Sequence, residues 1–408
     1  MNLLSFSINH AIDFAYILVA TGAICGYRRL RFSAPNLAAV YLPVTGLIFL
    51  YLLTGESLVL LLYSGYAVLC WTLYKIYSKF QSAITGAANA MVVLFALILV
   101  FYKVIYLELI SIDPMSWVPI LGVSYVSFRA LDFSIEMGRG RIKTNVSLLD
   151  MASYLMFFPT LSQGPIMRFL KFQKELNAPL QKLSTNILIR DIERLCIGII
   201  KILFLGKLFF YCTPFNVDVA ESVVNKPGLA ILSLYATYLY IYTEFSGISD
   251  IAIVFSKWTG FTAPENFDRP LLARNPQEFW ARWHMSLTKW CQDHIFFNLQ
   301  VRMIKMSPGA KAYLVAIVPV LTTFTVIGLW HGVTFHWLYY GMFHAGGVYL
   351  VILAKSFEFD CWLIELGGTS WNLILAFVGR ALTFNFVSMS LVFALPQKTG
   401  EQILALVF

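Results

Sequence analysis

Apolar runs long enough to cross a lipid bilayer recur along almost the whole chain. The clearest of them are Leu37–Leu53, Leu58–Tyr77, Ala87–Leu107, Leu195–Tyr211, Tyr313–Leu329 and Leu373–Phe393. An α-helix of about 20 apolar residues spans a hydrocarbon core of about 30 Å. Together with the interrupted runs between them, these segments predict about ten to twelve spans. The pattern therefore predicts an all-α polytopic membrane protein, with residues 1–408 forming a single membrane-embedded domain.

Three stretches break this pattern because they are too polar, or too rich in glycine and proline, for lipid-facing helices. They are Phe157–Leu176, Thr243–His284 and Gly328–Gly347. Broken backbone at membrane depth is tolerated only where protein buries it or a water-filled cavity satisfies it. We therefore expect re-entrant segments around a non-lipid interior such as a pocket, a funnel or a pore. The first of them, Phe157–Pro165, is too short to span and is expected to return to the cytoplasmic side.

The composition of the chain also indicates a membrane protein, and the positions of its basic residues predict its orientation in the membrane. The chain is 59% hydrophobic with a mean hydropathy of +0.71, and it is 13% charged, against about 25% for soluble domains. Its net charge of +8 does not require nucleic acid, because excess Lys and Arg in a polytopic protein mark the cytoplasmic loops. Basic residues follow the first, third and fifth runs, and the intervening connections are acidic. This alternation predicts the lipid bilayer rather than nucleic acid as a partner, and an N-terminus outside without a cleavable signal peptide.

The segment that begins at Phe296 has the pattern of an amphipathic helix. Apolar residues recur there at helical spacing with polar residues between them, namely Phe296, Leu299, Met303 and Met306 against Gln300, Arg302 and Lys305. Such a helix suits the cytoplasmic interface. Two interpretations remain open, a helix that lies on the bilayer and a docking face for a cytosolic partner. The candidate docking residues are Phe296, Leu299, Met303 and Ile304.

The histidines are the leading candidates for chemistry. Two of the six, His10 and His294, have no evident chemical neighbour, and the others are His284, His331, His336 and His344. His331 lies near the outer end of an apolar run, between Gly328 and Gly332, whose missing side chains leave room for another chain or a ligand. An ionisable residue at membrane depth is a functional candidate by default. A histidine beside tryptophan is also commonly a packing residue, so the residues alone leave both interpretations open.

The spacing of these histidines argues against a metal ion. His331, His336 and His344 lie five and eight residues apart, with no carboxylate between them. They do not stack on one helical face as ligands at positions i and i+4 would. We therefore expect no bound metal. A neutral imidazole in an apolar pocket is better suited to general-base catalysis on a hydroxyl group.

Two histidine motifs make the chain recognisable. "FWARWHMSLTKW" is followed by "GLWHG", with 331 − 284 = 47 residues between the two histidines. Further matching stretches are "LGVSYVSFRALDFSIEM", "FFPTLSQGPIMRF", "ENFDRPLLARNPQEFW" and "YYGMFHAGG". In this order, from about residue 115 to residue 390, the chain resembles the membrane-bound O-acyltransferase superfamily and, within it, the branch that transfers D-alanyl groups to teichoic acid.

The resemblance implies a fold and a set of site residues. The fold would be a ring of transmembrane helices with re-entrant segments around a thin central tunnel, which joins an extracellular funnel to the cytoplasmic face. His331 is similar to the catalytic histidine of the family, which acts as a general base, and His284 to its second motif histidine. The residues expected to line the tunnel are Trp280, Trp283, Trp330, Ser286, Asp293 and Gly332.

The same resemblance implies the donor, the partners and the location. In the D-alanyl branch a cytosolic acyl carrier protein docks on the inner face and presents its acyl group as a phosphopantetheine thioester. We therefore expect no permanently bound cofactor. The acyl group then reaches an acceptor hydroxyl on the outer side, with an outer-side membrane-anchored transfer partner. The chain is accordingly expected to be a multi-pass protein of the cell membrane.

Two alternatives and three departures from the family pattern accompany this interpretation. Within the class, the alternative is O-acetylation of an exopolysaccharide or peptidoglycan. From another class, a transporter or channel would explain ionisable groups in apolar surroundings, for which structural pairing is the simpler account: Arg129, Asp132, Glu244 and Asp250. The chain departs from the family at Met167, at "EFSGIS" and at Gln292, which replace the usual Asp, "DFAGYS" and Arg. These changes leave the specificity for acyl group and partner open.

Overall fold

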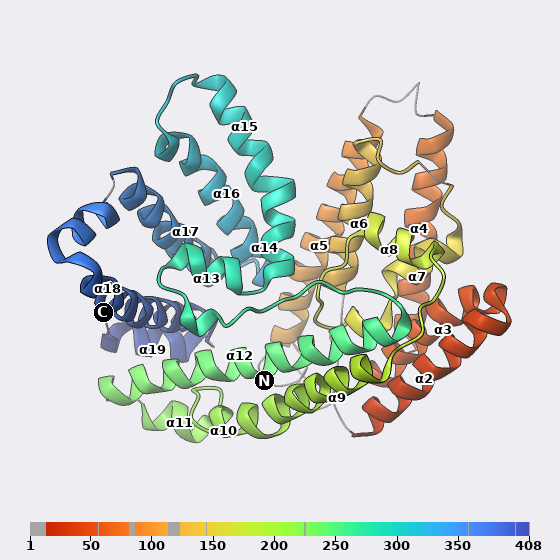
Figure 1. Ribbon diagram of the computed structural model, residues 1–408, viewed down its shortest axis with the longest axis horizontal. Helices are drawn as coiled ribbons and strands as arrows, with labels where there is room; N and C mark the ends of the chain where they lie inside the picture. Colours follow the sequence, from red (N-terminus) through yellow and green to blue (C-terminus); the bar gives the residue numbers. More distant parts are fainter. Residues whose placement is uncertain are drawn as a thin grey trace. The chain divides into compact units, whose positions relative to one another are not determined.

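The computed structural model describes residues 14–55, 57–80, 86–112, 123–143, 145–223, 226–357, 359–395 and 397–407. Within these ranges the chain forms helices joined by loops, without a β-strand (Figure 1). The helices gather into two compact units, Met1–Ile200 with Gly247–Pro264, and Lys201–Ser246 with Glu265–Phe408. That residues 1–408 form a single membrane-embedded domain stays a prediction.

The predicted all-α polytopic architecture is confirmed. Among the described residues, five helices are long and apolar enough to cross a membrane, and they cover Pro35–Thr54, Leu58–Phe80, Ala312–His331, Phe335–Ser356 and Leu373–Ala394. The predicted run Leu195–Tyr211 is instead divided between α9 (Thr185–Ile200), a π-helical turn η2 (Lys201–Gly206) and α10 (Lys207–Phe210). The total of ten to twelve spans stays a prediction, and the placement of the N-terminus falls on residues outside the described ranges.

The first unit is built from helices that pack as successive neighbours. Its elements are α2 (Phe14–Ser33), α3 (Pro35–Thr54), α4 (Leu58–Phe80), α5 (Ala87–Ile112), α6 (Val123–Gly138), α7 (Leu148–Leu155), η1 (Phe158–Thr160), α8 (Phe169–Asn177), α9 and the end of α12 (Pro227–Thr259). Phe157–Pro165 is not a span, because it contains only the single 3₁₀ turn η1 in a largely buried loop. The Phe158 ring stacks on Phe49 of α3 at 4.5 Å between centroids, which holds this loop in the core of the unit.

Two buried charges of α6 organise that loop. The Arg129 guanidinium is fully buried and donates to the carbonyl oxygens of Tyr154, Leu155 and Thr160, each at 2.9 Å. These carbonyls include the end of α7, where a helix leaves its last carbonyls without helical partners. The Asp132 carboxylate accepts from the backbone N–H of Phe169 at the start of α8, at 2.9 Å. Both side chains are thus engaged in structural hydrogen bonds rather than exposed in a site.

The second unit contains the histidine motifs. Its elements are η2, α10, α11 (Val217–Ser222), most of α12, η3 (Pro270–Leu272), α13 (Pro276–Arg282), α14 (Met285–Cys291), the π-helical turn η4 (Gln292–Phe296), α15 (Phe297–Met306), α16 (Ala312–His331), α17 (Phe335–Ser356), α18 (Phe359–Ser390), η5 (Leu391–Ala394) and α19 (Gln397–Val407). Helices α15, α16 and α17 follow one another side by side (Figure 1).

Small residues allow α16 and α17 to approach closely. A Cβ atom on Gly328 would lie 2.2 Å from the carbonyl oxygen of Trp337, and one on Gly341 would lie 2.4 Å from that of Phe324. Small residues at such a crossing are typical of helix pairs in membranes. The space that Gly328 and Gly332 leave beside His331 is therefore taken by α17 of the same chain. The expectation that it admits another chain or a ligand is wrong at Gly328.

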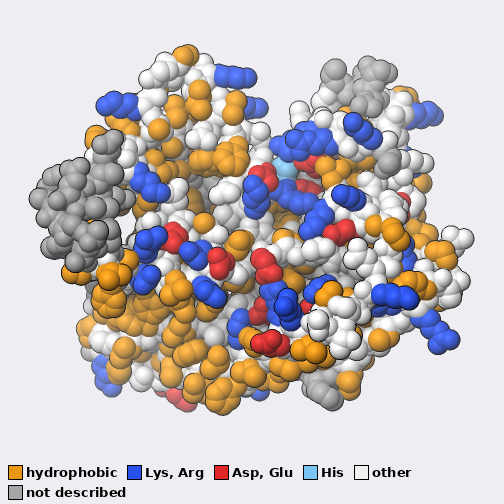
Figure 2. Space-filling model, viewed as in Figure 1, with side chains coloured by type: hydrophobic (Ala, Val, Ile, Leu, Met, Phe, Trp, Pro, Cys, Tyr) orange, Lys and Arg blue, Asp and Glu red, His pale blue; other side chains and the backbone are white. Residues whose placement is uncertain are grey.

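The outer surface of this unit is strongly apolar. Figure 2 shows hydrophobic side chains gathered over α10 to α12, where Leu208, Tyr211 and Leu232 are 54, 67 and 59% exposed. On α18, Leu373 and Phe377 are 79 and 71% exposed. Such a surface would be costly in water, and it fits a bilayer, whose hydrocarbon solvates apolar side chains without penalty.

Candidate active site

His284 lies at a sharp turn between α13 and α14. Its φ angle is +43°, in the left-handed region that non-glycine residues seldom adopt. The side chain is buried, with 2% of its surface exposed. Asn266 holds this turn, because its backbone carbonyl accepts from the N–H of Met285 at 2.9 Å. Asn266 was not singled out from the sequence, although it lies within the quoted motif "ENFDRP".

The Asn266 side chain also fixes the tautomer of His284. Its Oδ1 atom accepts from the backbone N–H of Ser286 at 3.3 Å and from the Ser286 hydroxyl at 2.8 Å. A backbone N–H can only donate, so the atom at this position is the amide oxygen rather than the nitrogen. His284 Nδ1 lies 3.0 Å from the same oxygen. We therefore assign the proton of neutral His284 to Nδ1, which leaves the acceptor lone pair on Nε2.

Burial keeps His284 neutral. Burial, together with a smaller effect of the nearby positive charge of protonated His331, lowers the pKa of His284 from 6.5 to about 3. Desolvation disfavours the charged imidazolium, and a like charge adds to that cost. His284 lies outside the candidate spans, in the turn before α14. At physiological pH it is therefore a neutral acceptor and not a cation.

The lowered pKa predicts an acid-sensitive stability. Between pH 6.5 and about 3 the unfolded chain takes up a proton on His284 that the folded chain refuses, so the free energy of unfolding falls by about 1.4 kcal/mol per pH unit as pH decreases. His284→Gln keeps a donor toward Asn266 and removes this contribution. Chemical denaturation in detergent at several pH values should show that the free energy of unfolding falls less steeply with decreasing pH in the variant than in the wild-type protein. The same pH dependence in both proteins would contradict the lowered pKa of His284.

His331 ends α16 within a group of aromatic rings. Its centroid lies 4.5 Å from that of Trp330, 4.8 Å from that of Trp337, which stacks on it, and 5.7 Å from that of Tyr340. The Trp330 centroid in turn lies 6.0 Å from that of His284. The structure thus brings His284 and His331 together around one indole ring, although they are 47 residues apart, since 331 − 284 = 47.

The other histidines occupy different environments. His344 is fully buried, its Nδ1 accepts from the Trp280 indole N–H at 3.2 Å, and its Nε2 lies 2.9 Å from the Ser390 hydroxyl. Both ring nitrogens are therefore used in holding α13, α17 and the end of α18 together. His336 is half-buried on α17, and His294 packs against Trp290 with 4.7 Å between ring centroids. His10 lies outside the described residues.

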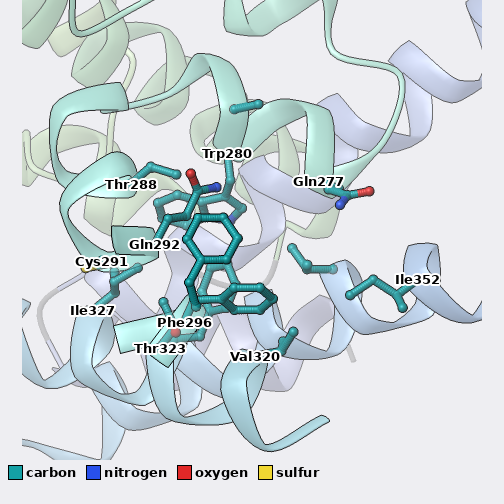
Figure 3. A pocket seen from close by; sticks show the side chains of 14 residues that line it. Gln277, Trp280, Thr288, Cys291, Gln292, Phe296, Val320, Thr323, Ile327 and Ile352 are labelled. Atoms are coloured by element: carbon teal, nitrogen blue, oxygen red, sulfur yellow. The ribbon is translucent and has the colours of Figure 1, made fainter. Parts of the chain in front are cut away.

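A cavity of about 250 Å³ lies within this unit. Figure 3 shows it between α13, α14 and η4 on one side and α16 and α17 on the other. Trp280 and Phe296 are on its wall, and Ile327 of α16 lies one helical turn before His331. Most of the lining is apolar, but the buried Thr323 hydroxyl also lies there and has no hydrogen-bond partner. The cavity thus lies in the same unit as His331 and reaches Ile327, one helical turn away from it.

The predicted tunnel residues divide into two groups. Trp280 lines the cavity, and Trp330 contacts both imidazoles. Trp283 instead stacks on Phe279 at 5.4 Å between ring centroids, within an aromatic cluster. The remaining three are engaged elsewhere: Ser286 on Asn266, Asp293 with Lys289 at 3.1 Å, and Gly332 against Trp337, whose ring a Cβ atom would meet at 2.4 Å. Their roles in lining a tunnel stay predictions.

Fold and site together define a class, that of multi-pass helical membrane proteins with a pair of histidines beside an apolar cavity. The comparison with protein families is specific, because the model of MBOAT, the membrane-bound O-acyltransferase family, matches residues 139–388. This chain belongs to that family, and it is therefore a membrane acyltransferase.

Individual relatives carry two kinds of name. The teichoic acid D-alanyltransferase of Bacillus subtilis is 28% identical over 379 residues, which cover 91% of this chain and 92% of that protein. The protein of the same name from Streptococcus thermophilus is 30% identical over 64% of this chain and 63% of its own length. The probable alginate O-acetylase of Pseudomonas fluorescens is 28% identical over 57% of this chain and 44% of its own length.

Proposed function

We propose that this acyltransferase moves a D-alanyl group from the phosphopantetheine thioester of a cytosolic carrier protein to a hydroxyl of a cell-envelope polymer such as teichoic acid. The observation that carries the proposal is the grouping of His284 and His331 around Trp330, one helical turn beyond Ile327, which lines a cavity beside the exposed amphipathic helix α15. Similarity to the teichoic acid D-alanyltransferase of Bacillus subtilis over nine-tenths of the chain supports the choice of acyl group. An outer-side membrane-anchored partner would then pass the acyl group to the polymer.

His331 would serve as the general base. Its imidazole takes the proton of the acceptor hydroxyl while that oxygen attacks the thioester carbonyl carbon. The carbon–sulfur bond then breaks, and the imidazolium returns the proton to the departing thiolate, so that an ester and a free thiol are formed without net proton release. A thioester is already activated, so alignment of the two substrates and this proton transfer supply most of what the reaction needs.

His284 would assist as an acceptor. With its proton on Nδ1 and held by Asn266, the neutral ring presents only a lone pair at Nε2. It therefore cannot donate a hydrogen bond to the oxyanion that develops on the carbonyl. It can accept a hydrogen bond from a donor that enters beside Trp330. We therefore propose that His284 only positions such a donor and does not stabilise the oxyanion.

The cavity offers a route for the pantetheine arm. Phe296 at the end of η4, Trp280 and Ile327 line it, and Figure 3 shows these side chains gathered around it. A largely apolar channel with a few polar groups suits a chain that alternates methylenes and amides. The buried Thr323 hydroxyl would donate to a carbonyl of that arm. No resident cofactor is needed, because the carrier brings the arm with it.

We propose a docking face on α15 that keeps Ile304 from the sequence prediction. Phe296 is turned into the cavity, and Leu299 and Met303 are half-buried. The exposed apolar stripe consists of Phe297, Val301 and Ile304, which are 45, 50 and 50% exposed. These residues recur at positions i, i+4 and i+7, the anchor spacing of one helix face. Exposed Arg302 and Lys305 beside the stripe would complement an acidic carrier.

A charge in this stripe is expected to weaken carrier docking. Ile304→Glu places a carboxylate within the apolar stripe and repels an acidic partner, so kcat/KM for the loaded carrier should fall at least about tenfold. Ser307→Glu adds the same charge at an exposed position just beyond α15 and is the matched control, with less than about twofold loss. Titration of the carrier against proteoliposomes measures both. Equal losses in the two variants would exclude a docking role for the stripe.

The alternative is O-acetylation, which the named alginate O-acetylases favour. Purified protein in proteoliposomes separates the two activities when it is supplied in turn with D-alanyl-carrier and acetyl-carrier thioesters and an envelope polymer as acceptor. The proposal predicts D-alanyl esters on the acceptor. Acetyl esters as the only product would overturn it in favour of the alternative.

A further inference from the structure

Three aromatic side chains pack around His331. Trp330, Trp337 and Tyr340 have their ring centroids 4.5, 4.8 and 5.7 Å from that of His331. Trp330 and Trp337 are half-buried, so part of each ring remains accessible. Tyr340 is held on its other side by His344, at 4.6 Å between centroids. Three rings from the end of α16 and the start of α17 thus surround one edge of the proposed general base.

Three carboxylates of the same unit pair with cations. Arg282 pairs with Glu278 at 2.9 Å and with Asp268 at 3.3 Å, and Lys289 pairs with Asp293 at 3.1 Å. His284 stays neutral and does not repel a cation that enters beside Trp330. The aromatic faces next to His331 have a quadrupole that attracts positive charge.

Reaction geometry brings the amino group of an aminoacyl donor to these rings. A general base lies within about 3 Å of the hydroxyl whose proton it takes, and that oxygen lies about 3 to 3.5 Å from the carbonyl carbon it attacks. The ammonium nitrogen of an alanyl group is two bonds from that carbon, or about 2.5 Å away. When the chain of these atoms folds back toward His331, the ammonium group comes within the reach of about 6 Å over which a cation and an aromatic face attract.

We propose that Trp330, Trp337 and Tyr340 form a subsite for the ammonium group of an aminoacyl donor and that Trp337 is a specificity-determining residue. The inference rests on the proposed D-alanyl transfer and extends it to the selection of the acyl group. An acetyl group has no charge to place there, so the subsite favours a cationic aminoacyl donor over a neutral one. Gly332 belongs to the same arrangement, because any side chain there would meet the Trp337 ring.

The test compares two donors that differ only in charge. The carrier is loaded chemically with a D-alanyl or a D-lactyl thioester, in which a hydroxyl replaces the ammonium, and kcat/KM is measured for each in proteoliposomes. For the wild-type protein we expect a preference for D-alanyl. Trp337→Leu keeps apolar bulk but removes the aromatic face, and it should reduce the D-alanyl value about tenfold more than the D-lactyl value. Trp337→Phe should retain most of the preference.

The outcomes separate the inference from the proposed function. Equal losses for both donors in Trp337→Leu would show that Trp337 only supports the His331 ring, and would overturn the subsite while leaving D-alanyl transfer intact. Equal kcat/KM values of the wild-type protein for the D-lactyl and D-alanyl donors would also overturn the proposed subsite. If the wild-type protein transfers neither group, the proposed function itself fails, and the subsite fails with it.

Discussion

Replacement of His331 by alanine is expected to reduce acyl transfer by about 10² to 10⁴-fold, the range that a positioned general base contributes. The His331 imidazole is the group that we propose takes the hydroxyl proton and returns it to the thiolate. Alanine leaves Trp330 and Trp337 in place but removes the ring that they contact. The loss should fall on kcat more than on KM for the carrier, because docking on α15 is untouched.

A matched control is available five residues further along the chain, since 336 − 331 = 5. His336 is also a half-buried histidine near the start of α17, and His336→Ala should retain activity within about threefold, as a substitution away from the reacting atoms. Single-turnover transfer from loaded carrier in proteoliposomes measures both variants. If His331→Ala transfers at the wild-type rate, or if His336→Ala loses as much as His331→Ala, the assignment of the base is wrong.

The second large effect concerns stability. Arg129→Met is expected to lower the free energy of unfolding by about 3 to 5 kcal/mol. The guanidinium donates to the carbonyls of Tyr154, Leu155 and Thr160 and also to the Thr160 hydroxyl. Methionine has similar length but no donor, so buried carbonyls at the end of α7 lose their partners. The turn η1 and the aromatic core around Phe158 should loosen together.

Arg141→Met provides the comparison for this variant. Its side chain is 58% exposed and pairs with Glu136 at 3.1 Å, and an ion pair that exposed contributes only about 0 to 1 kcal/mol. Thermal or chemical denaturation in detergent should therefore place Arg141→Met near the wild type and Arg129→Met far below it. Similar midpoints for the two variants would show that the buried hydrogen bonds of Arg129 do not hold the loop.

The long apolar helices were predictable because their signal is local. The run Tyr313–Leu329 corresponds to α16, Ala312–His331, and the run Leu58–Tyr77 corresponds to α4, Leu58–Phe80. Hydropathy over about 20 residues suffices, since a spanning helix satisfies its own backbone. The hydrogen bonds of Asn266 to the His284 turn are not local in this sense. They join residues 18 positions apart through a left-handed turn that no periodicity indicates.

The docking stripe lies next to a local irregularity that the periodic pattern did not indicate. The sequence predicts Phe296, Leu299, Met303 and Ile304 as candidate docking residues, and of these Ile304 belongs to the exposed stripe. The structure inserts the π-helical turn η4 just before α15. A π-turn changes the number of residues per turn and so rotates the faces of the helix that follows. The exposed stripe accordingly begins at Phe297 rather than at Phe296.

The central claim is that His331-dependent acyl transfer by this protein places D-alanyl esters on the cell envelope. The most direct test is mass spectrometry of ester-linked groups on envelope polymers from cells that lack the gene and carry either the wild-type protein or His331→Ala at equal membrane abundance. The account predicts that D-alanyl esters disappear on deletion, return with the wild-type protein and stay absent with His331→Ala. Restoration of D-alanyl esters by His331→Ala, or loss of a different acyl group on deletion, would contradict it.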